Sequence, residues 1–421
     1  MIKKLKLNSE FSKNVLTLMT GTTIAQAIPI AISPILTRIY TPEDFGVFSL
    51  YVSIVAFLSV LVTGRYELAI MLPKKKDDAL QIVFLSIFLT IVLSLMIFIF
   101  MLLFHSYIVK LLGNSEIERW LYWVPLSVFL VGLYQSLNYW HNREKSYKTI
   151  AKSKVSQSFT TGLTNLGLGY ENYAAAGLIF GNIMGSFIAT SVLAKFFYDN
   201  YPSFFKQIHF TKIYFFIKKY KKQPLINLPN ALIDQFRLVG INVMVSNFYS
   251  VALLGQFSLA WKMLQTPMSL LSGSLSQVFF QKVTVEKKEN LYFLVKKFII
   301  KSSFLSIPIF LFIYFYSVDI FMFMFGEKWK IAGEIASILV PWMFLNFISS
   351  PISSVYLIIN KQEIVFLFSI FYMLIPLSII FLFHSLDIVM ILTLVSYTMS
   401  FMLVFFILLL LFLLKKLKVT K

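Results

Sequence analysis

Two residues of opposite charge interrupt an apolar stretch early in the chain. Arg65 and Glu67 lie within "VLVTGRYELAIML", which starts at Val60 and ends against the lysines at 74–76. Ionisable side chains inside such segments are costly in a membrane, and they usually face a bundle interior or a water-filled cavity. A guanidinium keeps its charge and offers planar, bidentate donors, so Arg65 is a candidate to bind an anion. Glu67 is expected on a different face of the same helix, and structural pairing with adjacent helices is the alternative for both residues.

Three further ionisable residues lie within long apolar segments. Asp234 and Arg237 are three positions apart, so they share one face of a predicted helix over 223–247. An internal ion pair is the alternative to a ligand-binding role for these two. Lys262 lies near mid-depth in a predicted helix over 252–281, too deep for its side chain to reach the head groups easily. We therefore expect Lys262 to line a cavity.

The other residue types that support chemistry are scarce. The chain has no cysteine, so it forms no disulfide and offers no thiolate to a metal. Its four histidines, His105, His141, His209 and His384, are far apart in the sequence and show no metal-ligand spacing. We expect no metal, no cofactor and no catalytic residues.

Membrane-spanning helices are predicted to position the charged residues. The 421 residues are 58% hydrophobic and only 14% charged, against about 25% charged in soluble domains. Apolar stretches long enough to cross a hydrocarbon core of roughly 30 Å recur along the chain, whereas a barrel would show short alternating segments. The prediction is an all-α polytopic membrane protein with about twelve transmembrane helices. They are expected at residues 12–37, 45–72, 80–110, 118–140, 151–170, 173–196, 223–247, 252–281, 291–324, 331–359, 363–384 and 387–414.

Most of the 38 lysines and arginines gather at one set of predicted helix ends. Because loops rich in Lys and Arg remain cytoplasmic, this bias places both termini in the cytoplasm. The net charge of +19 is then a topology signal, with attraction to anionic lipid head groups as a by-product. Nucleic-acid binding is disfavoured, because no soluble basic domain is expected.

The two halves of the sequence show a weak internal repeat. "DFGVFSL" at 44–50 resembles "LLGQFSL" at 253–259, and three further short matches follow in the same order. Both halves start on the same side, so they would form two six-helix bundles related by a parallel pseudo-two-fold, with a cleft between them. The predicted domains are an N-terminal lobe over 1–197, a basic and aromatic cytoplasmic linker over 198–222 and a C-terminal lobe over 223–421.

Three stretches carry a resemblance to a known family. "SPILTRIYTPEDFGVFSLYVSIV" (33–55), "GRYELAIMLPKKKDDA" (64–79) and "LGQFSLAWKMLQTPMSLLSGSLSQVFFQKV" (254–283) resemble the bacterial polysaccharide biosynthesis/export family. That family includes O-antigen and capsule repeat-unit flippases and belongs to the multidrug/oligosaccharidyl-lipid/polysaccharide exporter superfamily. The resemblance implies a flippase that moves a polyprenyl-diphosphate-linked oligosaccharide across the cytoplasmic membrane by alternating access, for O-antigen (lipopolysaccharide), capsule or exopolysaccharide assembly.

The resemblance suggests roles for the charged and polar residues. Arg65, Arg237 and Lys262 would form a basic path for the diphosphate, and Glu67 or Asp234 would carry a coupling ion. The same two carboxylates and the amides of neighbouring helices would hydrogen-bond sugars, although such amides more often join helices. The full predicted set is Arg65, Arg237, Lys262, Glu67, Asp234, Gln26 and Asn230.

Other functions and partners follow from the same reasoning. A peptidoglycan lipid-precursor flippase or a cation-coupled multidrug antiporter of the same superfamily is the alternative. A membrane glycosyltransferase or polymerase is less favoured, because every predicted outer loop is short. The expected partners are the lipid-linked oligosaccharide, the bilayer, and polymerase and chain-length proteins, and we expect a monomer that binds no nucleic acid.

Overall fold

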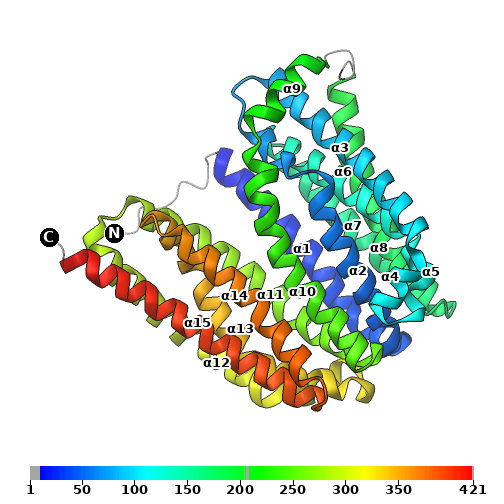
Figure 1. Ribbon diagram of the computed structural model, residues 1–421, viewed down its shortest axis with the longest axis vertical. Helices are drawn as coiled ribbons and strands as arrows, with labels where there is room; N and C mark the ends of the chain where they lie inside the picture. Colours follow the sequence, from blue (N-terminus) through cyan, green and yellow to red (C-terminus); the bar gives the residue numbers. More distant parts are fainter. Residues whose placement is uncertain (1–9, 203, 205–207, 420–421) are drawn as a thin grey trace. The chain divides into compact units, whose positions relative to one another are not determined.

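The computed structural model describes residues 10–202, 204 and 208–419. Over these residues the chain consists of helices and their connections, without a β-strand (Figure 1). The predicted all-α fold is confirmed. Five of the lysines used in the orientation argument lie outside the described residues: Lys3, Lys4, Lys6, Lys206 and Lys421.

Within the described chain, each predicted membrane segment overlaps one long helix. The first compact unit, Met1–Val239, holds α1 (Glu10–Ile39), α2 (Pro42–Val62), α3 (Lys76–Leu103), α6 (Val124–Arg143), α7 (Tyr147–Tyr170) and α8 (Ala175–Asn200). The second unit, Gly240–Lys421, holds α11 (Val251–Val285), α12 (Leu291–Phe325), α13 (Lys330–Ile358), α14 (Gln362–Phe383) and α15 (Ile388–Val419). The boundary between the units falls within α10 (Leu228–Phe248). The lobe boundaries expected at 197 and 222 remain predictions.

By length and composition, eight helices of the described residues can cross a membrane, or up to nine if one bent pair counts as a single span. The long helices α7, α10 and α11 are not among the eight. They carry more polar residues, including Asp234, Arg237 and Lys262. Helices of this kind need protein or water around them rather than lipid alone.

Three predicted segments are interrupted. The segment expected over 118–140 is broken between Leu121 and Val124, with a bend of 54°. The segment expected over 45–72 ends as an α-helix at Val62, and a short 3₁₀ helix, η1 (Tyr66–Met71), follows it. The segment expected over 80–110 ends at Leu103, and the separate α4 (His105–Leu112) follows. The prediction of one continuous second helix was therefore wrong, and the break falls at the two charged residues of the segment.

Shorter helices complete the first unit. They are α5 (Glu118–Leu121), α9 (Phe210–Lys219) and the π-helical turn η4 (Gln223–Asn227). Within the basic and aromatic segment expected as the linker, α9 is an amphipathic helix. It buries Ile213 and Phe216 against the first unit and exposes its other aromatic side chains and its lysines.

The capping box at the start of α2 accounts for the acidic stretch "YTPEDFG". The Thr41 hydroxyl accepts a hydrogen bond from the Asp44 backbone N–H at 3.2 Å, and the Asp44 carboxylate accepts one from the Thr41 N–H at 2.9 Å. Pro42 occupies the first helical turn, where its missing N–H has no cost. This arrangement satisfies two donors that the helix leaves unpaired, so Asp44 has a structural role.

A row of glycines lets α8 approach α7 closely. A Cβ on Gly177 would collide with the Tyr40 hydroxyl, and one on Gly181 would collide with the Asn165 side chain. One on Gly185 would collide with the Thr161 hydroxyl. The four-residue spacing of these glycines is typical of helices that pack closely in a membrane.

In the second unit, α13 packs against α11, α12, α14 and α15. Trp329 and Trp342 are fully buried at or near its N-terminal half. Hydroxyl groups tie α13 to its neighbours: Ser317 donates to the Gly333 carbonyl at 2.9 Å and Ser396 to the Ile338 carbonyl at 2.6 Å. These bonds satisfy polar groups internally, as an apolar surrounding requires.

The glycine row gives a direct test of packing. Gly181→Ala is expected to lower the free energy of unfolding by about 1–3 kcal/mol, because the new Cβ overpacks the α7–α8 contact. Gly167→Ala on α7 is the matched control, since a Cβ there meets nothing within 4 Å and alanine favours a helix. Thermal unfolding of the detergent-solubilised chain measures both variants. Equal melting temperatures for the two would contradict the packing described here.

Candidate functional site

The chain leaves the α-helical path immediately after α2. Thr63 closes the helix, and both Gly64 and Arg65 have left-handed backbone conformations, with φ of 55° and 59°. Short-range bonds, such as Tyr66 N–H to the Thr63 carbonyl at 3.1 Å, hold the reversal. Glycine adopts such a φ freely, but for arginine it costs about 1–2 kcal/mol. Strain of this kind persists only where the surroundings enforce it, and it clusters at functional sites.

Arg65 and Glu67 form an ion pair at this break. The terminal guanidinium nitrogen Nη1 of Arg65 lies 3.4 Å from Oε1 of Glu67. The Glu67 side chain is 1% exposed and that of Arg65 is 25% exposed. The expectation that the two residues point to different faces of one helix was wrong, because residues 63–71 do not continue α2 and the turn brings the side chains together.

The pair is only partly satisfied. The Thr63 hydroxyl lies beside the carboxylate, but neither Glu67 oxygen meets a donor in hydrogen-bonding geometry among the described residues. Nε of Arg65 is likewise buried without an acceptor in the described part of the chain. Buried charges are stable only when paired and hydrogen-bonded, so this pair has capacity for a further polar ligand.

Neighbouring elements hold η1 in place. The Tyr66 hydroxyl donates to the Ile217 carbonyl of α9 at 3.2 Å. The Arg143 guanidinium, at the end of α6, donates to the carbonyls of Ile70 at 3.1 Å and Pro73 at 2.7 Å. Ala69 and Ile70 are fully buried in a cluster with α3 and α6. The Arg65–Glu67 pair therefore sits on a rigid support.

A polar face of α6 lies beside the pair. Tyr139 is close enough to Arg65 and Glu67 to interact electrostatically with both. Gln135 and Asn138 share its side of the helix by their spacing. Their side-chain oxygens are buried and lack hydrogen-bond partners among the described residues. These three residues were missed, although three polar side chains on one face of an apolar helix are visible in "VGLYQSLNYW".

A second polar network lies where α3 begins and α6 and α8 end. The Glu144 carboxylate accepts hydrogen bonds from Lys76 at 2.7 Å and from the Tyr201 hydroxyl at 2.8 Å. The Lys76 ammonium also lies over the Tyr201 ring at 4.7 Å. Burial alone would raise the pKa of Glu144, but the bonds from Lys76 and Tyr201 outweigh it and lower the pKa below its ordinary value of 4.5. The network fixes the start of α3 to the end of α6, next to Arg143.

The other predicted site residues are spread over three helices. Gln26 is half-buried on α1, and its Oε1 has no hydrogen-bond partner among the described residues. Asn230 and Asp234 are exposed on α10, where Arg237 is half-buried and attracts the Asp234 carboxylate. Lys262 is exposed on α11. Of the seven predicted residues, the structure brings Arg65 together with Glu67 and Asp234 near Arg237.

The arrangement at η1 suits an anionic, hydroxyl-rich ligand. The accessible side of the Arg65 guanidinium offers donors to an anion. The neighbouring amides and the Tyr139 hydroxyl offer donors and acceptors to neutral hydroxyl groups. In the described residues no group of three or more His, Cys, Asp or Glu side chains is placed to hold a metal ion.

Comparisons with known proteins concern the family and the fold. Residues 35–334 match the family model described as "Polysaccharide biosynthesis protein". The fold is similar to that of the lipid II flippase MurJ in an inward closed conformation, with a TM-score of 0.75 and 16% identity over 94% of this chain and 87% of that one. No curated protein sequence gives a significant match.

Two further solved structures are similar. One is an inward-facing multidrug resistance MATE family transporter of the MOP superfamily, with a TM-score of 0.63 and 13% identity over 94% of this chain and 96% of that one. The other is a MOP superfamily transporter from Pyrococcus furiosus, with a TM-score of 0.60 and 14% identity over 96% and 95% of the two chains. At these identities the likeness shows the fold, and it confirms the predicted architecture of two six-helix bundles.

The Glu144 network predicts a pH dependence of stability. The Glu144 carboxylate has a lowered pKa in the folded chain. The network therefore contributes its full stabilisation of the folded state above about pH 4.5, and this contribution is lost as the pH falls through the lowered pKa. Glu144→Gln is therefore expected to lower the melting temperature at pH 7 modestly, and to converge with the wild type in stronger acid. Glu171→Gln, at an exposed position, is the control. A difference in melting temperature between Glu144→Gln and the wild type that stays constant down to low pH would contradict this explanation.

Proposed function

The chain belongs to the polysaccharide biosynthesis protein family, and from this premise we propose that it is a flippase for a polyprenyl-diphosphate-linked oligosaccharide. In this proposal the chain transfers a repeat unit across the cytoplasmic membrane by alternating access, for assembly of O-antigen, capsule or exopolysaccharide. Both termini would be cytoplasmic, as the distribution of lysines predicts.

The Arg65–Glu67 pair at the end of α2 carries the proposal. Arg65 has a strained backbone and lies beside a carboxylate. Apart from the adjacent Thr63 hydroxyl, no further donor of the described residues is placed for that carboxylate. A purely structural pair gains little from such a geometry, because the cost of desolvating both charges opposes their attraction. A diphosphate that reaches the exposed quarter of Arg65 would supply the missing acceptors.

The polar face of α6 supports the sugar part of the proposal. Gln135, Asn138 and Tyr139 present amide and hydroxyl groups along one side of a membrane helix. Sugar hydroxyls both donate and accept hydrogen bonds, so they would satisfy oxygens that have no partner among the described residues. The remaining predicted residues stay proposed substrate-binding residues of their own units: Gln26, Asn230, Asp234 and Arg237 in the first and Lys262 in the second.

Glu67 is proposed to link transport to an ion. A proton on its carboxylate would weaken the bond to Arg65 and release the guanidinium for the substrate. Asp234, next to Arg237, is the second candidate carrier. An inside-negative potential would also assist outward movement of the anion, by about 2.3 kcal/mol per charge per 100 mV.

One alternative is supported by a specific comparison. The fold likeness to the lipid II flippase MurJ makes the peptidoglycan lipid precursor a second candidate substrate with the same diphosphate chemistry. A cation-coupled multidrug antiporter is less well supported, because Glu67 and Asp234 each lie beside an arginine that would repel a cationic drug. A glycosyltransferase or polymerase is disfavoured by the short connections on the predicted outer side, such as residues 40–41, 249–250 and 384–387.

Arg65→Ala tests the proposal in the native host. Surface polysaccharide is expected to fall by about 10- to 100-fold, because one charge-assisted contact of about 1.5–3 kcal/mol is lost. Arg65→Lys keeps the charge but not the bidentate geometry, so we expect it to restore only part of the activity. Sugar analysis of the cell surface, with an immunoblot for protein level, measures both.

The control is Arg119→Ala, which removes an exposed arginine of α5. Deletion of the gene should leave viable cells that accumulate lipid-linked oligosaccharide on the inner leaflet. Arrest of peptidoglycan synthesis on deletion would favour the second candidate instead. Normal surface polymer in the Arg65→Ala strain would exclude Arg65 from the mechanism.

A further inference from the structure

A long groove runs between α11 and α12 in the second unit. Its volume is about 870 Å³, within the range of specific ligand sites. Most of the lining is apolar, with Phe347 of α13 contributing to the wall. Several large lining side chains are well exposed, among them Leu271 at 57% and Leu305 at 74%. Such a surface is suited to an apolar chain.

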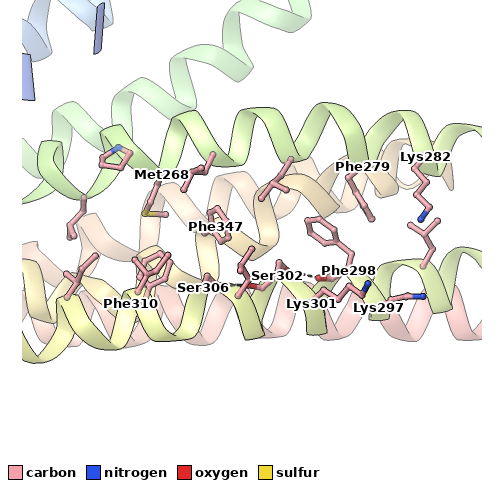
Figure 2. Close-up of a pocket in the computed structure, with 18 of the residues that line it drawn as sticks. Met268, Phe279, Lys282, Lys297, Phe298, Lys301, Ser302, Ser306, Phe310 and Phe347 are labelled. Carbon is pink, nitrogen blue, oxygen red and sulfur yellow. Dashed lines mark hydrogen bonds between the residues drawn. The ribbon is translucent and has the colours of Figure 1, made fainter. Parts of the chain in front are cut away.

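The two ends of the groove differ in charge. Figure 2 shows Lys282, Lys297 and Lys301 together at one end, while Met268 and Phe310 lie toward the other. Glu286 is the acidic residue of the lining, so the charged end is net positive. The apolar part thus leads away from a basic end.

The serines in the groove offer little to a polar ligand. Ser302 donates to the Phe298 carbonyl at 2.7 Å, and Ser306 donates to the Ser302 carbonyl at 2.7 Å. The Phe279 and Phe298 rings, 4.2 Å apart, adjoin the basic end. Beyond these rings the lining of the groove offers almost only hydrocarbon to a ligand, so a phosphate group must bind at the lysines.

We propose that this groove binds the polyprenyl tail of the carrier lipid, with its diphosphate held by Lys282, Lys297 and Lys301. The proposal rests on the proposed function and adds to it a docking site separate from Arg65. In the orientation set by the lysine bias, the basic end faces the cytoplasmic leaflet. The tail would stay in the groove, shielded from water, while the sugars are transferred.

The length of the groove favours a polyprenyl chain over a phospholipid. The apolar lining of α12 runs from Phe298 to Ile313, which is about 22 Å at roughly 1.5 Å per residue. One leaflet of a hydrocarbon core of roughly 30 Å is about 15 Å deep, which limits an ordinary acyl chain. A chain that fills this groove crosses the midplane. Three lysines also suit a diphosphate better than the single phosphate of a phospholipid.

Photo-crosslinking tests the occupant directly. The full-length chain is placed in vesicles of phosphatidylcholine with a polyprenyl diphosphate that carries a diazirine on its tail. Crosslinked peptides are expected from α11 and α12, within 263–313. Excess unlabelled polyprenyl diphosphate should compete, and the same excess of phosphatidylglycerol should not. Equal competition by phosphatidylglycerol, or labelling confined to other helices, would overturn the proposal.

Two matched pairs of variants test the lysines of the groove and its apolar lining separately. Lys297→Glu with Lys301→Glu should reduce crosslinking by at least about tenfold, whereas Lys296→Glu, an exposed neighbour outside the groove, should leave it unchanged. Leu305→Trp should block the apolar part. Leu311→Trp places the same side chain at an exposed position outside the groove. Equal crosslinking in both members of either pair would contradict the proposal.

The outcome also separates this proposal from the flippase assignment. If the groove is strongly labelled, but deletion of the gene leaves the surface polymer unchanged, the flippase proposal is refuted and the tail-binding site is retained. Full surface polymer in the Leu305→Trp strain, with the protein at normal level, would refute the tail site and retain the flippase.

Discussion

A charged side chain within an apolar helix bundle is stable only if something nearby compensates for the water it has lost. Arg65 and Glu67 meet this requirement with each other, at 3.4 Å, and with little else. This requirement constrains the backbone conformation next to the two residues. The helix must end at Val62 and the backbone must turn left-handed, since a continuous helix would direct the two side chains apart.

The support of this turn comes from groups that are themselves hydrogen-bonded. Arg143 bonds the carbonyls of the η1 segment, and Lys76, Glu144 and Tyr201 join the adjacent helix ends. Close packing of α7 and α8 through glycines completes the first unit. The contrast between these hydrogen-bonded supporting groups and the incompletely satisfied pair is the reason why we propose a function for Arg65.

The sequence predicted most of the fold, because hydropathy over long windows reports burial in lipid directly. All twelve expected ranges overlap long helices in the described chain. The end of the second helix was missed, since "LAIML" reads as a continuation although it packs as a 3₁₀ turn. Gly64 was the available signal, as glycine before a charged pair suits a positive φ. Glu67 and Arg65 were identified by charge alone, but their contact depends on a turn that periodicity does not reveal. The groove between α11 and α12 likewise depends on which faces meet, which the sequence does not specify.

The left-handed backbone of Arg65 has a consequence for protein engineering. At a φ of 59°, glycine or asparagine is more comfortable than any long side chain. Replacing this arginine would relieve about 1–2 kcal/mol of backbone strain, but it would leave the buried Glu67 carboxylate without its cation, a loss of about 3–5 kcal/mol. Thermostabilised variants intended for structural work should therefore keep the arginine at position 65, although its backbone conformation alone would favour glycine.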